Sequence, residues 1–438
     1  MMRTIGMAGL VALAACSETA QLDVAAGTGT DPALPEPTET LFPTVNIAEV
    51  GAWSPGETPR AATGFTVTEY ARDFDHPRWM YKLPNGDILV AETNKPPEEA
   101  SGVRAWIEKN IMSRAGAGVP SADRITLLRD ADADGTVDER HIFLEDGLAS
   151  PFGMTLVGDT FYVANFAGLR GYPYASGAVR IDGPGEDLAA FSAIGDKAGH
   201  WTRNLIASPD GTKLYVAIGS VSNVMEDNPE VEDGRAAIHE YDIRTGKMQP
   251  FATGLRNPVG MDWNPVTGEL WTAVNERDML GSDLVPDYMT SVKAGGFYGW
   301  PYSYYGQIVD DRTADTRPDL VARAIKPDYA LGPHTASLGL AFTPAGGGVV
   351  VGQHGSWNRK PRSGYKVVYV PMADGAPAGA AQTLLDGFLV GDTAKGRPVG
   401  VTFDRTGALL VADDVGNRIW RVVPTGRAPE TVPEPTES

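Results

Sequence analysis

Side chains that carry charge or protons recur at one position of a repeated pattern, just before the first of two apolar segments. The series is Arg78, Phe152, His200 with Arg203, Arg256, His334 and Arg397. The planar guanidinium group of arginine suits carboxylates and phosphates, which it binds through paired hydrogen bonds. If the repeats close into a ring, these side chains converge near its axis, which predicts a pocket for a ligand with several acidic groups. Alternatively, each arginine braces a neighbouring repeat through a local carboxylate.

His200 is the candidate general base, because neutral imidazole is the usual proton acceptor near neutral pH. The chain has 6 histidines, and of the two that belong to the series, His200 is the one accompanied by an arginine, Arg203. A buried structural histidine is the alternative interpretation. The sequence contains no nucleophile elbow, no metal-binding histidine pair at helical spacing and no dinucleotide-binding glycine motif.

The repeated pattern predicts the fold. Each repeat has two short apolar segments joined by a turn, and the turn glycines are Gly86, Gly158, Gly211, Gly268, Gly347 and Gly407. Two such segments form a β-hairpin, and a repeat of this size is typical of propellers. We therefore expect an all-β chain, a six-bladed β-propeller of four-stranded antiparallel blades over residues 63–424. A strand at 65–70 would pair with one at 417–422 and close the ring, which removes exposed sheet edges.

The N-terminal residues predict export and anchoring. Residues 1–15 read as a lipoprotein signal peptide, and Leu13-Ala14-Ala15-Cys16 resembles a bacterial lipobox in which Cys16 is lipidated. The alternative is an ordinary signal peptide with a chance cysteine. Residues 16–62 are rich in Pro, Thr and Glu and predict a tether that can pack around 42–53, and residues 425–438 predict a disordered tail. The expected location is the periplasmic face, anchored by lipid, at the outer membrane in preference to the inner one.

The charge of the chain limits its partners. The net charge is −19, which argues against nucleic acid as a partner and against an anionic membrane surface beyond the lipid anchor. An anionic ligand would need a local basic pocket.

Three further segments carry specific expectations. Asp130, Asp132 and Asp134, followed by Gly135, resemble a calcium-binding loop, with a plain acidic turn as the alternative. Residues 98–114 have the spacing of a short amphipathic helix. Residues 279–335 are expected to form a long loop that shapes the opening of a ligand pocket.

Several motifs together resemble the L-sorbosone dehydrogenase family, a branch of the quinoprotein sugar dehydrogenases that bind pyrroloquinoline quinone (PQQ) on a six-bladed propeller. The resemblance covers about residues 34–424. The motifs are His76-Pro77-Arg78-Trp79, Leu83-Pro84-Asn85-Gly86-Asp87, residues 114–120, Gly199-His200-Trp201-Thr202-Arg203-Asn204, Leu255-Arg256-Asn257-Pro258-Val259-Gly260, Gly296-Phe297-Tyr298-Gly299-Trp300-Pro301 and Gly352-Gln353-His354-Gly355-Ser356-Trp357-Asn358.

The resemblance implies roles for individual residues. His200 would take the proton of the substrate hydroxyl while hydride passes to the quinone. Asn223 would contact the quinone, Lys395 and Arg397 would hold PQQ carboxylates, and the backbone carbonyls of Glu276 and Arg277 would hold a calcium ion.

The sequence departs from this pattern at one position. Related glucose enzymes carry an arginine directly before the asparagine, where this chain has Ser222. Polarisation of the quinone would then come from Arg203 or Arg256.

The expected function is therefore PQQ-dependent oxidation of an aldose or a sugar-derived aldehyde, with electrons passed to a separate cytochrome or quinone acceptor. The alternatives are a calcium-dependent sugar lactonase and a propeller that binds sugar or protein without catalysis.

Overall fold

A computed structural model describes residues 18–38, 44–96, 118–191, 198–225, 229–313 and 316–426. The predicted signal peptide, Cys16, the expected helix at 98–114 and residues 427–438 of the predicted tail lie outside these ranges. The regular secondary structure of the described chain is almost entirely strands, with one short α-helix, α2 (Pro318–Val321), and two 3-10 turns, η1 (Val24–Gly27) and η3 (Pro229–Glu232). The prediction of an all-β chain is confirmed. Among the described residues, no helix is long and apolar enough to cross a lipid bilayer.

Within the described ranges, six sheets each contain four antiparallel strands in meander order. The first three comprise β5 (Pro77–Lys82), β6 (Ile88–Glu92), β7 (Arg124–Arg129) and β8 (Glu139–Leu144); β9 (Gly153–Val157), β10 (Thr160–Asn165), β11 (Gly168–Pro173) and β12 (Glu186–Ala190); and β13 (Arg203–Ala207), β14 (Lys213–Ile218), β15 (Ala237–Asp242) and β16 (Lys247–Thr253). The other three comprise β17 (Pro258–Trp263), β18 (Leu270–Val274), β19 (Pro286–Ser291) and β23 (Tyr329–Pro333); β24 (Ser337–Phe342), β25 (Gly348–Gln353), β26 (Lys366–Ala373) and β28 (Gln382–Asp386); and β31 (Pro398–Phe403), β32 (Leu409–Asp413), β33 (Arg418–Pro424) and β4 (Phe65–Arg72).

Short strands extend these sheets or form small ones of their own. They are β1 (Thr28–Gly29), β2 (Glu49–Val50), β3 (Arg60–Ala61), β20 (Gly296–Phe297), β21 (Ser303–Tyr304), β22 (Ile308–Val309), β27 (Ala376–Pro377), β29 (Leu389–Val390) and β30 (Thr393–Ala394). The first two strands of five sheets, and β31 with β32, are the six hairpins that the sequence predicted. Each has a turn glycine with positive φ, at 86, 158, 211, 268, 346 and 407, a conformation that glycine adopts without steric cost.

The first strands of neighbouring sheets lie side by side around a ring. β5 contacts β9, β9 contacts β13, β13 contacts β17, β17 contacts β24, β24 contacts β31, and β31 contacts β5 again. Glycines allow this close approach: a Cβ atom on Gly153 would lie 2.1 Å from the main-chain nitrogen of Leu205, and one on Gly339 would lie 2.1 Å from the carbonyl oxygen of Val399. The ring therefore brings together the residues that precede each first strand.

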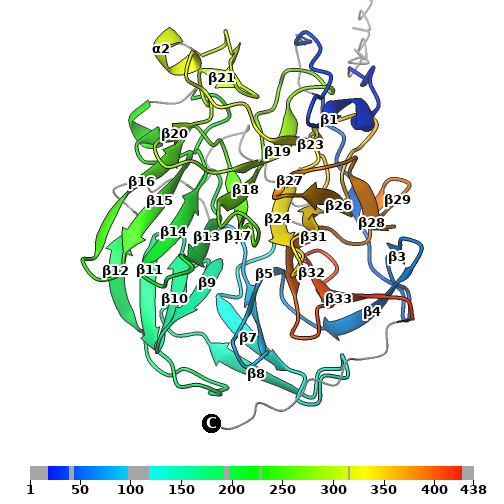
Figure 1. The fold of residues 1–438 in the computed structure, drawn as a ribbon. Coiled ribbons are helices and arrows are strands. Elements are labelled where there is room, and N and C mark those ends of the chain that lie inside the picture. Colours follow the sequence, from blue (N-terminus) through cyan, green and yellow to red (C-terminus); the bar gives the residue numbers. More distant parts are fainter. Residues whose placement is uncertain are drawn as a thin grey trace, which may run out of the picture.

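One sheet joins the beginning and the end of the described chain. β4 pairs with β33 over seven residues, and Arg418 reaches Glu69 on the neighbouring strand. Figure 1 shows β4 and β33 side by side although they stand at opposite ends of the colour scale. The predicted closing strand pair is confirmed.

The described part of residues 16–62 packs along the sheets over most of its length. β1 pairs with β23, β2 pairs with β30, and β3 pairs with β28. Trp53 is buried, stacks edge-on against Trp420, and donates a hydrogen bond from Nε1 to Asp413. These contacts extend well beyond the local packing that the composition of a tether predicts.

The expectation of a continuous loop at 279–335 was wrong. Strands β19 and β23, the third and fourth of their sheet, lie inside this range. Every residue of both strands is buried, so neither shows the alternation of apolar and polar residues that identifies a half-exposed strand. The part between them carries β20, β21, β22 and α2.

Candidate functional site

The residues of the predicted series lie at one end of the ring, because each precedes or opens a first strand. Arg78 lies in β5, while His200, Arg256, His334 and Arg397 stand within three residues of β13, β17, β24 and β31. Loops that leave the second strands, including those after β14, β18, β25 and β32, end at the same side. Arg203 opens β13, and Phe152, which precedes β9, is fully buried and contacts the rings of Trp79 and Trp201.

The surroundings of His200 fix its tautomer. Its Nδ1 lies 2.8 Å from the carbonyl oxygen of Ser220, so Nδ1 carries the hydrogen and donates it. Nε2 is then unprotonated and has no hydrogen-bond partner among the described residues. Burial, assisted by the positive charge of Arg256, lowers the pKa of His200 to about 3. The ring is therefore neutral at physiological pH, with a lone pair on Nε2.

Arg203 faces the main chain. Its guanidinium donates hydrogen bonds to the carbonyls of His200 (2.8 Å) and Thr202 (3.0 Å), and it lies over the ring of Phe166. Arg235 also donates to the carbonyl of His200, at 3.2 Å, and to that of Gly219, at 2.6 Å. This geometry makes both arginines positioning residues for His200. Arg235 was missed in the sequence because it belongs to a loop 35 residues further along the chain.

Asn223 and Arg256 form the next part of the site. Nη2 of Arg256 donates to Oδ1 of Asn223 at 2.9 Å, and Trp300 donates from Nε1 to the Asn223 carbonyl at the same distance. Ser222 is buried and donates its hydroxyl to Glu232 at 2.6 Å. Of the two arginines that could replace a charge at position 222, the structure therefore places Arg256 beside Asn223, whereas Arg203 is engaged elsewhere.

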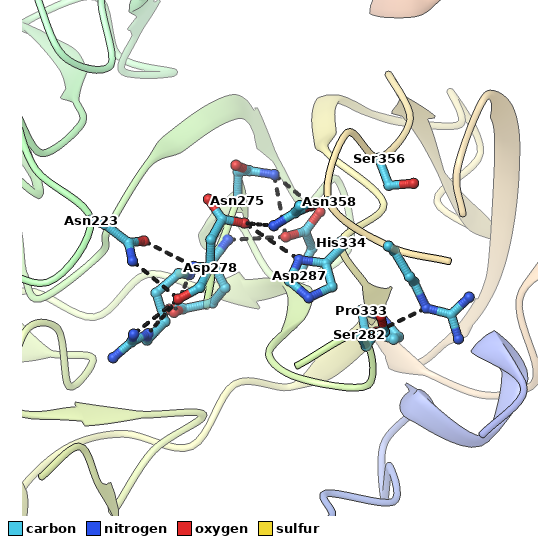
Figure 2. A network of polar contacts seen from close by, with 12 residues as sticks. Asn223, Asn275, Asp278, Ser282, Asp287, Pro333, His334, Ser356 and Asn358 are labelled. Carbon is cyan, nitrogen blue, oxygen red and sulfur yellow. Dashed lines mark hydrogen bonds and ion pairs between the residues drawn. The ribbon is translucent and has the colours of Figure 1, made fainter. Parts of the chain in front are cut away.

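Asp278 is the centre of the polar network in Figure 2. Its Oδ1 accepts a hydrogen bond from Asn358 (2.7 Å) and lies 3.4 Å from Nδ1 of His334, while Arg256 is 3.4 Å from Oδ2. Nε2 of His334 donates to the Gly281 carbonyl at 2.8 Å. Burial alone would lower the pKa of His334, but the hydrogen bond and negative charge of Asp278 outweigh it and raise that pKa. Asp278 thus holds the side chains of Arg256 and His334 in place at this end of the ring.

The turn at 275–278 does not fit a calcium ion at the Glu276 carbonyl. Nη1 of Arg256 donates to this carbonyl at 2.6 Å and lies 3.3 Å from the Asn275 carbonyl. A divalent cation bound there would meet a guanidinium on its own ligand and be repelled. The side chain of Arg277 points elsewhere and pairs with buried Asp310.

The remaining basic residues of the series differ in their partners. Arg78 donates to Asp414 at 2.5 Å, and Lys395 forms an ion pair with Glu57. Arg397 is 4% exposed, and the one hydrogen bond that its side chain makes among the described residues is to the Tyr365 hydroxyl at 3.3 Å; its Nε has no partner. A buried guanidinium without a carboxylate is costly, so Arg397 fits an acidic group of a bound ligand.

The acidic loop gathers a different set of side chains from the predicted one. Asp130, Asp132 and Asp138 bring one carboxylate oxygen each within 4.8 Å of the others. Asp134 instead accepts a hydrogen bond from the main chain of Thr136. The strand register sets this difference, because Asp138 reaches back to the nitrogen of Ala131 next to Asp130.

Two acidic residues of the site, Asp278 and Asp414, were not among the predicted residues. Asp414 follows β32 directly, and the sequence signal was an apolar strand that ends in two carboxylates. His354 and Asn358, in the loop after β25, were noted only as parts of a motif.

Comparisons with known proteins identify the family of the chain and proteins that share its fold. A family model described as TrAA12-like matches residues 59–292 and 306–425. An uncharacterised protein from Borreliella burgdorferi is 31% identical over 233 residues, which are 51% of this chain and 60% of that protein. A PQQ-dependent pyranose dehydrogenase from Coprinopsis cinerea is 27% identical over 50% of this chain and 39% of its own length. The chain thus spans less than two thirds of these two relatives.

A third relative covers more of the chain. It is a PQQ-dependent sugar dehydrogenase from Hypocrea jecorina, 24% identical over 83% of this chain and 88% of its own. Among solved structures, a Trichoderma reesei enzyme of carbohydrate-active family AA12 has a TM-score of 0.69 at 21% identity, covering 89% of this chain and 100% of that one. The PQQ domain of the Coprinopsis cinerea pyranose dehydrogenase has a TM-score of 0.67 at 21% identity, covering 86% and 99%. These structures share the fold of this chain.

Proposed function

The chain belongs to the TrAA12-like family, and from this premise we propose that it is a PQQ-dependent dehydrogenase acting on an aldose or a sugar-derived aldehyde of the sorbosone type. The names of two relatives support both the cofactor and the sugar class. The observation that carries the proposal is the unpaired, buried guanidinium of Arg397 at the end of the ring that also holds neutral His200. Arg397 would bind an acidic group of the ligand, and His200 would accept a proton from the substrate.

The residues divide the chemistry between them. When bound, PQQ supplies a quinone carbonyl that accepts a hydride from the substrate carbon. Nε2 of His200 takes the hydroxyl proton of the sugar, or of the hydrated aldehyde, at the moment when the carbon–hydrogen bond breaks. The Ser220 carbonyl keeps the acceptor nitrogen free of hydrogen and stabilises the imidazolium that forms.

The cationic groups hold the ligand. Arg256 places a positive charge beside Asn223 that favours an oxygen gaining negative charge there, and Arg397 binds a carboxylate. Asp278 fixes Arg256 from one side and His334 from the other. We derive no step through calcium, because Arg256 occupies the Glu276 carbonyl.

We also propose a blade number, an electron acceptor and a location for this protein. The ring of first strands supports a six-bladed propeller, one blade per four-stranded sheet. Two electrons per turnover would leave to a separate cytochrome or quinone acceptor. The lipobox-like sequence before Cys16 supports lipid anchoring at the periplasmic face of the outer membrane.

Reconstitution tests the proposal. The purified protein is incubated with PQQ, separated from free PQQ by gel filtration, and assayed for reduction of an artificial dye with sugars and small sugar aldehydes. Retained PQQ absorbance and sugar-dependent dye reduction that is lost in His200→Asn are expected. Lactone hydrolysis without dye reduction would favour a lactonase, and the absence of both activities and of PQQ binding would refute the dehydrogenase.

A further inference from the structure

Asp414 collects three basic side chains at the same end of the ring as His200. Its carboxylate is fully buried and lies 2.5 Å from Nη1 of Arg78, 2.9 Å from Nε2 of His354 and 3.4 Å from Nε2 of His76. Burial alone would raise the pKa of Asp414, but the three neighbours together lower it, so Asp414 is ionised.

Asp414 fixes the tautomer of His354. Nε2 lies within 3.2 Å of both carboxylate oxygens, so Nε2 carries the hydrogen and donates it. Nδ1 therefore has a free lone pair, and it makes no hydrogen bond to any residue in the described ranges. The side chain is 19% exposed, whereas Asp414 behind it is covered. The free nitrogen is thus on the open side of the pair.

Burial, reinforced by two nearby arginines, keeps His354 neutral without a ligand. Burial lowers its pKa to about 4; Asp414 opposes this effect, while Arg397 and Arg78 reinforce it. Arg78 is balanced by Asp414, whereas Arg397 lacks a carboxylate and lies over the ring of Tyr365. A negative group placed here would neutralise Arg397 and, through its own charge, favour protonation of His354 against the burial that is the main cause of its low pKa.

We propose that His354 is a ligand-binding residue that takes a proton from solvent onto Nδ1 as it binds a carboxylate of the cofactor. The carboxylate stays ionised and accepts the new N–H bond, and Asp414 stabilises the resulting imidazolium through Nε2–H. This inference rests on the proposed function, since it takes the carboxylate to be that of PQQ. Binding and proton uptake are coupled by linkage, so the affinity depends on pH.

Calorimetry of the PQQ-free protein tests this coupling without any turnover. PQQ is titrated near pH 7 into the full chain in buffers of different ionisation enthalpy, and the slope of the heat against that enthalpy gives the protons taken up. We expect about one proton for the wild type and close to none for His354→Gln. Glutamine can still donate to Asp414 but cannot be protonated, and its affinity should be about tenfold weaker. His141→Gln, an exposed histidine on β8 paired with Glu139, should behave as the wild type.

A second measurement needs no variant. If binding takes up a proton, the wild-type affinity for PQQ should fall by up to tenfold per pH unit as the pH rises from about 6 to 8. Equal proton uptake in the wild type and His354→Gln, or an affinity independent of pH, would overturn the inference while leaving the proposed function intact. No binding of PQQ by the wild type would overturn both.

Discussion

Arg397 should destabilise the protein when no cofactor is bound. Its guanidinium is 4% exposed, has one long hydrogen bond to Tyr365 and leaves Nε without a partner. Its contact with the Tyr365 ring, 5.0 Å from the centroid, is worth about 0.5 to 2 kcal/mol. The desolvation of a buried ion costs several kcal/mol. The cost therefore exceeds the gain.

Arg397→Met keeps the apolar volume and removes the charge. Replacing a poorly compensated buried charge by a hydrophobic side chain commonly stabilises a protein by ~1 to 4 kcal/mol, and the backbone hydrogen bond from Arg397 to Asp413 is unaffected. We expect the free energy of unfolding of the cofactor-free protein to rise by ~1 to 3 kcal/mol. The same variant should lose affinity for PQQ, so stability and binding change in opposite directions.

Arg359→Met is the matched control. Arg359 is equally buried, but it donates to the carbonyls of Ser282 and Leu22 and pairs with Asp283. Its loss leaves the buried Asp283 carboxylate without a paired cation, with hydrogen bonds only from the main chain of Gln21 and Leu22, and should destabilise by ~3 to 5 kcal/mol. Urea denaturation of both variants without PQQ gives the comparison. Equal destabilisation of Arg397→Met and Arg359→Met would refute the inference that the charge of Arg397 is uncompensated until an acidic ligand binds.

Three further outcomes follow from the site and the ring. His200→Asn should lower kcat/KM by about 10²- to 10⁴-fold. Because the pKa of His200 is about 3, the plot of wild-type kcat/KM against pH should show no acidic inflection near 6.5. An inflection there that is absent from the variant would contradict the assignment of His200 as a neutral base. Asp278 raises the pKa of His334 in the folded protein. The pair therefore stabilises the fold fully below the unfolded pKa of about 6.5, and this stabilisation declines as the pH rises through the folded pKa. His334→Asn should lower the free energy of unfolding more at acidic than at alkaline pH, and an equal decrease at both would exclude a charged His334. Gly153→Ala places a Cβ atom 2.1 Å from a main-chain nitrogen of β13 and should destabilise by ~1 to 3 kcal/mol in denaturant unfolding, whereas Gly347→Ala, with open space around it, should be nearly neutral.

The hairpins and the position of the charged series could be predicted from local signals. A turn glycine between two short apolar segments defines each hairpin, and repetition places Arg78, Arg256 and Arg397 at equivalent points. The closing strand pair followed from the need to cover sheet edges. These features depend on neighbouring residues or on the repeat itself.

The partners of the charged residues could not be predicted. Arg78 pairs with Asp414, 336 residues away in sequence, and Lys395 pairs with Glu57, 338 residues away. The guanidinium of Arg397 contacts no carboxylate among the described residues. The three arrangements look alike in sequence, because each begins with a basic residue at a strand entrance. Strands β19 and β23 escaped prediction because their complete burial removes the alternating pattern.

The pairing of β4 with β33 also determines the stage of folding at which the site can form. Arg418 and Glu69, which meet in this sheet, are 349 residues apart in sequence, so the contact closes a loop that spans most of the chain, at an entropic cost that grows with the logarithm of loop length. Because the first strands lie in one ring, the residues of the site cannot all reach their places until this last sheet is complete. Folding of this chain is therefore expected to be slow and dominated by non-local contacts, and ligand binding should appear only with the final closing step.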